Sequence, residues 1–219
     1  MHAEVKTFKN DFIQISEVYD TRNNSLDYVV MYFCYNPENY QQIENQIKEY
    51  RKNKSTCLIG CIKSNDEKYS DLKKPTSLFD VHLDSASDLD FENLIDFCIS
   101  TEDSVLNCEL NDFKSQRVTE ISIYTSQNNS IAKLIENLQN KISIQLENRS
   151  EEKYPKVVIS LMSNGRELQI SEVKEFMDSI SGYLTDDAQC MLNTCDCMEK
   201  LKKDEIKVTG IFFEKKTRY

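Results

Sequence analysis

The sequence predicts an α/β portion at the N-terminus, followed by a two-layer α+β domain in which helices pack on one face of a mixed sheet. Two observations predict this class. Apolar stretches of strand length alternate with segments whose apolar residues recur every three or four positions, as in amphipathic helices. Turn residues are scarce, with 4 glycines and 3 prolines in 219 residues, whereas sandwiches and propellers need many tight turns.

The N-terminal portion is assigned to residues 1–87 and is expected to contain one βαβ unit. Residues 11–19 (DFIQISEVY) are typical of a strand, and residues 26–33 (LDYVVMYF) form the continuous apolar run of a central strand. A second buried strand is expected at 56–62 (TCLIGCI). A helix between these last two strands would make a right-handed parallel unit.

That connecting helix has start signals and one apolar face. Asn36 and Pro37 offer a cap and a first-turn proline. The apolar face would carry Ile43, Ile47 and Tyr50. The helix is therefore expected to begin at about residue 37.

The domain boundary is placed between residues 87 and 88. Residues 63–87 are polar and irregular, with Lys73-Lys74-Pro75 in their middle. A new helix is expected to start near Asp88, because an apolar stripe follows it at helical spacing. That stripe consists of Phe91, Leu94, Ile95 and Cys98.

The second domain, residues 88–219, continues with a strand and a helix. Residues 119–125 (TEISIYT) alternate between apolar and polar as a strand does, and the turn-like residues 126–129 (SQNN) follow. The next helix has apolar residues in regular helical spacing, namely Ile131, Leu134, Ile135, Leu138 and Ile142.

The last part of this domain is expected to hold three strands and one helix. Residues 156–162 (KVVISLM) form a strand, and a helix carrying Val173, Phe176, Met177 and Ile180 follows it. The final strands are 188–197 and 204–213, joined by the short charged segment MEKLKK. This short link predicts that the two strands pair as an antiparallel hairpin.

Charge and hydropathy limit the partners of the chain. The formal net charge is −10, from 37 acidic and 27 basic residues, and the lysines are scattered along the chain. This distribution argues against nucleic-acid binding. No run of about 18 apolar residues and no signal-peptide core occurs, so we expect no membrane insertion and a cytoplasmic location.

Eight cysteines raise the question of metal or redox chemistry. Most of them, such as Cys34 and Cys61, lie in apolar stretches typical of buried, reduced thiols. The exception is Cys195-Asp196-Cys197, but a zinc site needs further ligands, and the sequence has only two histidines. We expect no metal and no cofactor, and a redox or metal role for Cys195 and Cys197 stays an alternative.

No catalytic centre is expected either. Ser163 and Cys195 are the nucleophile candidates, and neither has a histidine nearby in the sequence. The carboxylate pair Asp186-Asp187 is interpreted as a solvated turn.

The stretch from Val157 to Phe213 resembles the C-terminal domain of the FtsZ/tubulin superfamily. In that family a strand with a small polar and glycine turn leads to a helix, an acidic turn and a strand, and a final strand reads D-E-(I/L)-(R/K)-V-T. The corresponding segments here are VVISLMSNGRELQISEV, DDAQCML and DEIKVTGIF. Residues 118–142 are similar, more weakly, to the first strand and helix of the same domain.

The resemblance also points to an interaction loop. Family members carry N-x-D-F-A-D, whose acidic residues reach the nucleotide of the next subunit in a filament. Residues 88–94 here read DLDFENL. Asp90 and Phe91 match that pattern, Asp88 replaces the asparagine, and Asn93 replaces the second acidic residue. A solvated helix start explains the same residues.

The family's nucleotide loop has no counterpart in this sequence. The family holds GTP on a GGGTGTG loop, because glycines let consecutive backbone amides approach phosphates. The strand-to-helix junction here reads VVMYFCYNPENYQQI and contains no glycine. Glu38 would add a negative charge at the helix N-terminus, where a phosphate would bind. We therefore expect no GTP binding and no hydrolysis.

The resemblance implies a non-catalytic assembly or adaptor protein. Its partner would be a protein, either a filament-forming FtsZ/tubulin-like relative or a second copy of the chain. Two alternatives remain besides the cysteine chemistry. One is a regulatory module that binds a small molecule in a pocket between the two halves. The other is a cytoskeletal FtsZ-like GTPase with an unusual nucleotide site.

Overall fold

A computed structural model describes residues 3–53, 55–63, 76–102, 119–147, 153–196 and 201–214. They fall into two compact units. The first runs from the N-terminus to Glu102 and takes in residues 119–121, and the second begins at Ser122. Strand β6 (Thr119–Asn128) therefore starts in the first unit and ends in the second.

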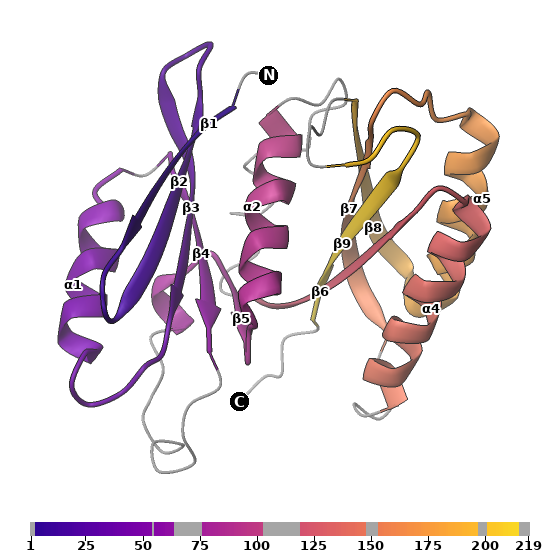
Figure 1. The fold of residues 1–219 in the computed structure, drawn as a ribbon. Coiled ribbons are helices and arrows are strands. Elements are labelled where there is room, and N and C mark those ends of the chain that lie inside the picture. The colour runs from indigo at the N-terminus through magenta and orange to yellow at the C-terminus, as the bar shows by residue number, and fades with distance from the viewer. Residues whose placement is uncertain are drawn as a thin grey trace. The chain divides into compact units, whose positions relative to one another are not determined.

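The first unit contains a mixed sheet (Figure 1). Strands β1, β2 and β3 pair antiparallel, and β3, β4, β5 and the start of β6 pair parallel. Their bounds are β1 Ala3–Lys9, β2 Ile13–Asp20, β3 Ser25–Phe33, β4 Cys57–Ile62 and β5 Val81–Asp84. The sequence had not predicted β1 and β5, since β1 is exposed along its length and β5 is only 4 residues long.

Helix α1 (Tyr40–Tyr50) connects β3 to its parallel neighbour β4, so the predicted βαβ unit is confirmed. Ile43 and Ile47 are fully buried against apolar residues of β2, β3 and β4. The predicted start of the helix was wrong by three residues. The helix begins at Tyr40 with Asn39 as its N-cap, because Asn36 and Pro37 belong to the turn before it.

Helix α2 (Asp88–Glu102) covers the opposite face of this sheet. Its Phe91 stacks on Tyr32 of β3, with ring centroids 5.2 Å apart. The predicted stripe is largely confirmed, because Phe91, Leu94 and Cys98 are buried, while Phe97 is more deeply buried than Ile95. A short 3₁₀ helix, η2 (Thr76–Leu78), precedes β5.

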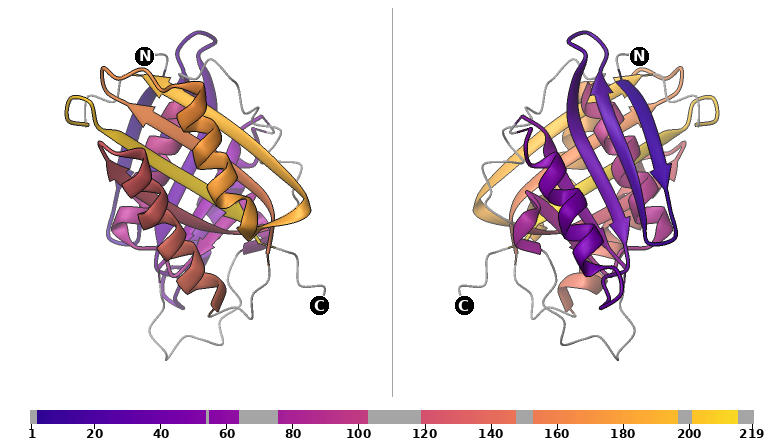
Figure 2. Two further views of the ribbon diagram at one scale, coloured as in Figure 1. Left: turned by 90° about the vertical axis from the view of Figure 1, so that its right-hand side faces the viewer. Right: turned by 90° about the vertical axis from the view of Figure 1, so that its left-hand side faces the viewer.

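The second unit contains a four-stranded sheet in the order β6-β9-β7-β8. Helices α4 and α5 lie side by side over one face of this sheet, as Figure 2 shows (left view). The predicted two-layer α+β arrangement is therefore confirmed. The bounds are α4 Ile131–Glu147, β7 Tyr154–Ser163, α5 Ile170–Ile180, η3 Ser181–Tyr183, β8 Leu184–Asp196 and β9 Ile206–Phe213.

The predicted hairpin between the last two strands was wrong. Strand β7 lies between them, pairing parallel with β8 and antiparallel with β9. The reason is burial. All eight residues of β9 are buried, which suits an inner strand, whereas β8 carries exposed residues such as Asp186 and Asp187 and forms the edge.

The domain boundary stays a prediction. The structure groups α2 with the first unit by its contacts with β1, β2 and β3, whereas the division at 87 and 88 assigned this helix to the second domain. None of the helices in the described residues is long and apolar enough to cross a membrane.

Candidate functional site

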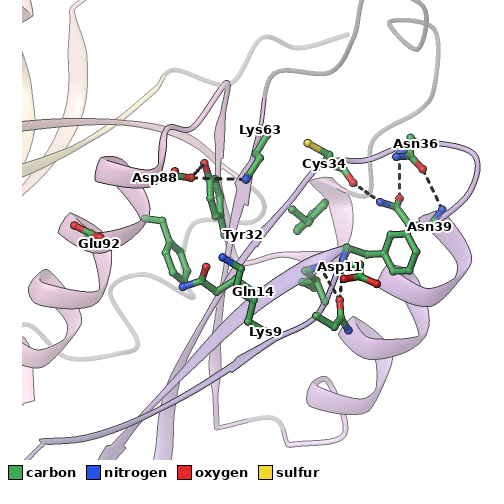
Figure 3. A pocket seen from close by; sticks show the side chains of 15 residues that line it. Lys9, Asp11, Gln14, Tyr32, Cys34, Asn36, Asn39, Lys63, Asp88 and Glu92 are labelled. Atoms are coloured by element: carbon green, nitrogen blue, oxygen red, sulfur yellow. Dashed lines mark hydrogen bonds and ion pairs between the residues drawn. The ribbon is translucent and has the colours of Figure 1, made fainter.

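The first unit contains a pocket of about 600 Å³ at the carboxyl end of β3 (Figure 3). The β1–β2 turn, the β3–α1 turn, Lys63 after β4 and the start of α2 contribute its walls. In α/β folds, ligands bind at the carboxyl ends of parallel strands. This pocket is therefore the candidate site, and its fifteen lining residues are Lys9, Asn10, Asp11, Phe12, Ile13, Gln14, Tyr32, Phe33, Cys34, Asn36, Asn39, Lys63, Asp88, Phe91 and Glu92.

Two asparagine side chains close the β3–α1 turn from within. Asn39 donates from Nδ2 to the carbonyl oxygen of Cys34 at 2.7 Å and accepts from the backbone N–H of Asn36 at 3.1 Å. Asn36 in turn accepts through Oδ1 from the backbone N–H groups of Glu38 and Asn39, at 3.0 and 3.1 Å. Figure 3 shows this reciprocal pair beside Cys34.

The same turn has no backbone N–H left over between residues 36 and 40. The N–H of Tyr40 is bonded to the carbonyl oxygen of Asn36 at 3.1 Å, and Pro37 has no N–H group. A phosphate site at a helix N-terminus uses such N–H groups as donors. An anion entering this turn would therefore have to break existing hydrogen bonds.

The N-terminus of α2 is also capped by its own side chains. Asp90 accepts through Oδ2 from the backbone N–H of Ser87 at 2.9 Å and from its hydroxyl at 2.7 Å. The hydroxyl oxygen of Ser87 accepts from the N–H of Asp90 at 3.2 Å. This is the reciprocal pattern of a capping box, with aspartate in the place of the usual glutamate.

Asp88 joins two further pocket residues, Tyr32 and Lys63. The Tyr32 hydroxyl donates to its Oδ1 at 2.5 Å, and the Lys63 ammonium lies 3.7 Å from the same oxygen. Lys63 also lies over the Tyr32 ring, 4.1 Å from its centroid. The hydrogen bond from Tyr32 and the charge of Lys63 lower the pKa of Asp88, and burial together with the Asp88 carboxylate raises the pKa of Tyr32.

The four residues of the predicted interaction loop have different environments. Asp88 is exposed, with 85% of its side chain accessible, and Asp90 serves the capping box. Phe91 and Asn93 are 2% and 5% exposed. The structure therefore brings Asp88 and Phe91 to the pocket wall and leaves Asn93 inside the first unit. Their role in contacts with a partner stays a prediction.

Sequence reasoning missed the roles of Asn39, Tyr32 and Lys63. The spacing of Asn36 and Asn39 is a usable signal, since asparagines three residues apart at a helix start often cap the backbone. Tyr32 and Lys63 carried no local signal. They meet Asp88 only because β3, β4 and α2 lie side by side.

The cysteines are distributed over different environments. Cys57, Cys61 and Cys98 are buried, Cys34 lines the pocket and Cys190 is exposed. Cys195 is buried in a small cluster with Met162 and Leu201, while Cys197 lies outside the described residues. Among the described residues, no group of three or more His, Cys, Asp or Glu side chains is placed to hold a metal ion.

No protein-family model matches the sequence. No curated protein matches it either. Solved structures do resemble it, although the identities are low. CetZ from Methanosaeta thermophila superposes with a TM-score of 0.54 and 13% identity, over 87% of this chain and 63% of that protein. FtsZ from M. jannaschii, an empty dimer, gives a TM-score of 0.50 and 13% identity, over 76% of this chain and 57% of that one.

The similarity covers most of this chain but less than two thirds of the length of either neighbour. At such identities it reports the fold. A mixed sheet with helices on both faces in the first unit and a two-layer α+β arrangement in the second agree with it. This chain therefore has an FtsZ/tubulin-like fold.

Proposed function

We propose that this chain is a non-catalytic FtsZ/tubulin-like protein, a pseudo-GTPase that acts through protein–protein contacts as an assembly or adaptor protein. The observation that carries the proposal is the self-capped turn between β3 and α1. Its backbone N–H groups from Asn36 to Tyr40 are all engaged within the turn. A phosphate could use the N–H groups of Asn36 to Tyr40 only by displacing these hydrogen bonds.

The second junction supports the same conclusion. A phosphate approaching the start of α2 would meet the Asp90 carboxylate inside the capping box and the exposed Asp88 carboxylate. Lys63, the cation at the end of β4, is engaged by Asp88 and by the Tyr32 ring. The pocket wall carries the carboxylates Asp11, Asp88 and Glu92 against the cations Lys9 and Lys63, so its charge does not favour a triphosphate. Residues 64–75, which follow β4, lie outside the described residues.

Protein contacts are the use of this fold that the proposal favours. The M. jannaschii FtsZ structure is that of a dimer, and we propose that this chain assembles with a filament-forming relative or with itself. Asp88 is the member of the predicted interaction loop that a partner could reach, with its neighbour Leu89 64% exposed. We also propose a cytoplasmic location, which the free thiols of Cys34, Cys61 and Cys190 support.

The proposal is tested by fluorescence anisotropy of a ribose-labelled GTP analogue titrated with the protein in the presence of Mg²⁺. We expect the anisotropy to stay at the value of the free nucleotide. A saturable rise that unlabelled GTP reverses would overturn the proposal and favour a GTPase with an unusual site. The same titration is made with the double variant Asp88→Asn/Asp90→Asn. This variant removes both carboxylates from the α2 N-terminus and so measures their contribution to excluding the nucleotide.

The pocket favours one second candidate, a small-molecule-binding regulatory module. Its volume of about 600 Å³ lies within the range of ligand pockets, and its wall combines the Phe12 and Phe91 rings with the polar ends of Gln14 and Asn36. A thermal-shift screen with metabolites tests it. A concentration-dependent rise in melting temperature that Gln14→Ala abolishes would favour this candidate over the adaptor.

A further inference from the structure

We propose that two copies of this chain join through their β1 strands, which pair antiparallel about a two-fold axis at Val5. The inference rests on the proposed function and names a second copy as its partner. The resulting dimer would continue the sheet of one first unit into the sheet of the other. The partner's strand would supply the hydrogen bonds that the outer edge of β1 lacks.

Strand β1 is an edge strand with a usable outer side. Among the strands that the structure describes, β1 pairs with β2 alone and stands at the end of the sheet. All seven of its residues pair with β2 in an unbroken register, so no bulge distorts the strand, and it contains no proline. Such an edge offers a row of backbone donors and acceptors to another strand. Figure 2 shows β1 at the margin of the first-unit sheet (right view).

The side chains of β1 are exposed enough to be covered by a partner. Six of its seven residues are exposed, among them Val5 at 36% and Phe8 at 53%. Phe12, in the turn towards β2, is 41% exposed. In the register argued below, Val5 is the apolar side chain that gains from burial against the second copy, whereas Phe8 and Phe12 lie beyond Ala3 of that copy.

Charge complementarity selects the register. A two-fold axis perpendicular to the sheet requires one residue to face its own copy, because side chains alternate between the two faces. Within one chain, Lys6 Nζ already lies 3.6 Å from Glu4 Oε1. With Val5 on the axis, Glu4 lies opposite Lys6 of the second copy and Lys6 opposite Glu4 of that copy, so the four side chains form one alternating group of charges. The register therefore makes two opposite-charge pairs around an apolar contact. Ala3 then faces Thr7.

The neighbouring registers are less favourable. An axis at Glu4 places two carboxylates face to face, and an axis at Lys6 places two ammonium groups face to face, which is destabilising. An axis at Thr7 places Lys6 opposite Phe8 and makes no opposite-charge pair. Among these four positions Val5 alone gives two attractive pairs.

The other sheet edge does not offer the same surface. Strand β8 is the edge of the second-unit sheet, and it exposes the consecutive carboxylates Asp186 and Asp187. Charged residues of one sign on an edge strand oppose pairing with an identical edge. The contrast assigns self-association to β1.

The test is a charge-reversal set measured by sedimentation equilibrium. We expect the unmodified protein to dimerise. Glu4→Lys and Lys6→Glu should each raise the dimer dissociation constant by at least roughly tenfold, since each turns two attractive pairs into repulsive ones. The double variant Glu4→Lys/Lys6→Glu should recover the affinity. An equimolar mixture of the two single variants should also dimerise, because every pair across that interface is then of opposite charge.

Matched controls make the result specific. Lys48→Glu reverses a charge on the exposed side of α1 and should leave the dimer unchanged. Val5→Cys should form an intermolecular disulfide on mild oxidation. The fraction of crosslinked dimer in Thr7→Cys should not exceed that in the unmodified protein. Crosslinking through Thr7→Cys in place of Val5→Cys would overturn the register. Circular dichroism checks that each variant is folded.

A monomeric unmodified protein, or a mixture of the single variants that stays monomeric, would overturn the β1 inference. This outcome differs from failure of the proposed function, which would appear as GTP binding. A dimer that forms equally with and without GTP is the result that both proposals predict.

Discussion

Asn39 Nδ2 donates to the carbonyl oxygen of Cys34 at 2.7 Å and ties the start of α1 to the end of β3. The same side chain accepts from the backbone N–H of Asn36, so one residue satisfies both sides of the turn. Asn39 is 1% exposed, and none of these bonds can be replaced by water without opening the turn. In this chain the turn at the carboxyl end of β3 is therefore stabilised by hydrogen bonds among its own residues.

Replacing Asn39 by alanine should lower the free energy of unfolding by about 1–3 kcal/mol, because the Cys34 carbonyl and the Asn36 N–H lose their partners. Asn39→Asp keeps the acceptor but sets a buried carboxylate oxygen against the Cys34 carbonyl oxygen, so it should destabilise at least as much at neutral pH. Urea unfolding curves measure both. Gln41→Ala, at an exposed position of α1, is the control, and equal stability of Asn39→Ala and the control would contradict this role.

Tyr32→Phe should raise the pKa of Asp88 towards that of an ordinary aspartate, because it removes the hydroxyl that donates to the carboxylate. The phenylalanine ring keeps the stacking on Phe91. The pKa is read from the pH dependence of the side-chain carboxyl ¹³C shift of Asp88. An unchanged titration in Tyr32→Phe would show that the hydrogen bond does not act on Asp88 in solution.

Asp20→Asn should make the free energy of unfolding depend less on pH in the acid range. Asp20 is the last residue of β2. Hydrogen bonds from Arg22 lower the pKa of its carboxyl group, which also accepts from Asn23 in the following turn. The folded-state pKa lies below the unfolded value of about 4, so its stabilisation is present above about pH 4 and is lost as pH falls through the folded pKa. Unfolding curves at several pH values should therefore show a shallower acid limb in the variant. Equal acid limbs would contradict the assignment.

Gly60→Ala should destabilise the first unit by roughly 1–3 kcal/mol, as overpacking in cores does. A Cβ atom at this position of β4 would lie 2.8 Å from the Phe79 ring. Gly182→Ala is the control, since a Cβ there meets nothing within 4 Å. Phe79→Leu in the Gly60→Ala background should restore part of the loss, and failure to do so would show that the ring is not the obstacle. Thermal unfolding followed by circular dichroism measures all three.

The sequence predicted the elements whose signal is local. The helical spacing in α4 and the apolar runs of β3 and β7 each identify an element without knowledge of its neighbours. The motif resemblance in residues 157–213 predicted an FtsZ/tubulin-like fold, which the structural similarity to CetZ and FtsZ confirms.

The errors come from long-range choices. Whether β9 pairs with β8 or with β7 depends on which strand is buried on both sides, and the short MEKLKK link favoured the wrong neighbour. β5 was missed because four residues are too few to show a period. At the site, Asp88 was identified, but its partners Tyr32 and Lys63 come from β3 and the end of β4, which only the fold brings together.

The most direct test of the central claim is a calorimetric titration of the protein with GTP and Mg²⁺, with light scattering recorded on the same sample. The account predicts no binding heat and no nucleotide-dependent change in scattering. Saturable binding accompanied by GTP-dependent scattering would contradict it, since it would require the turn closed by Asn36 and Asn39 to open for a phosphate or the nucleotide to bind elsewhere in the chain.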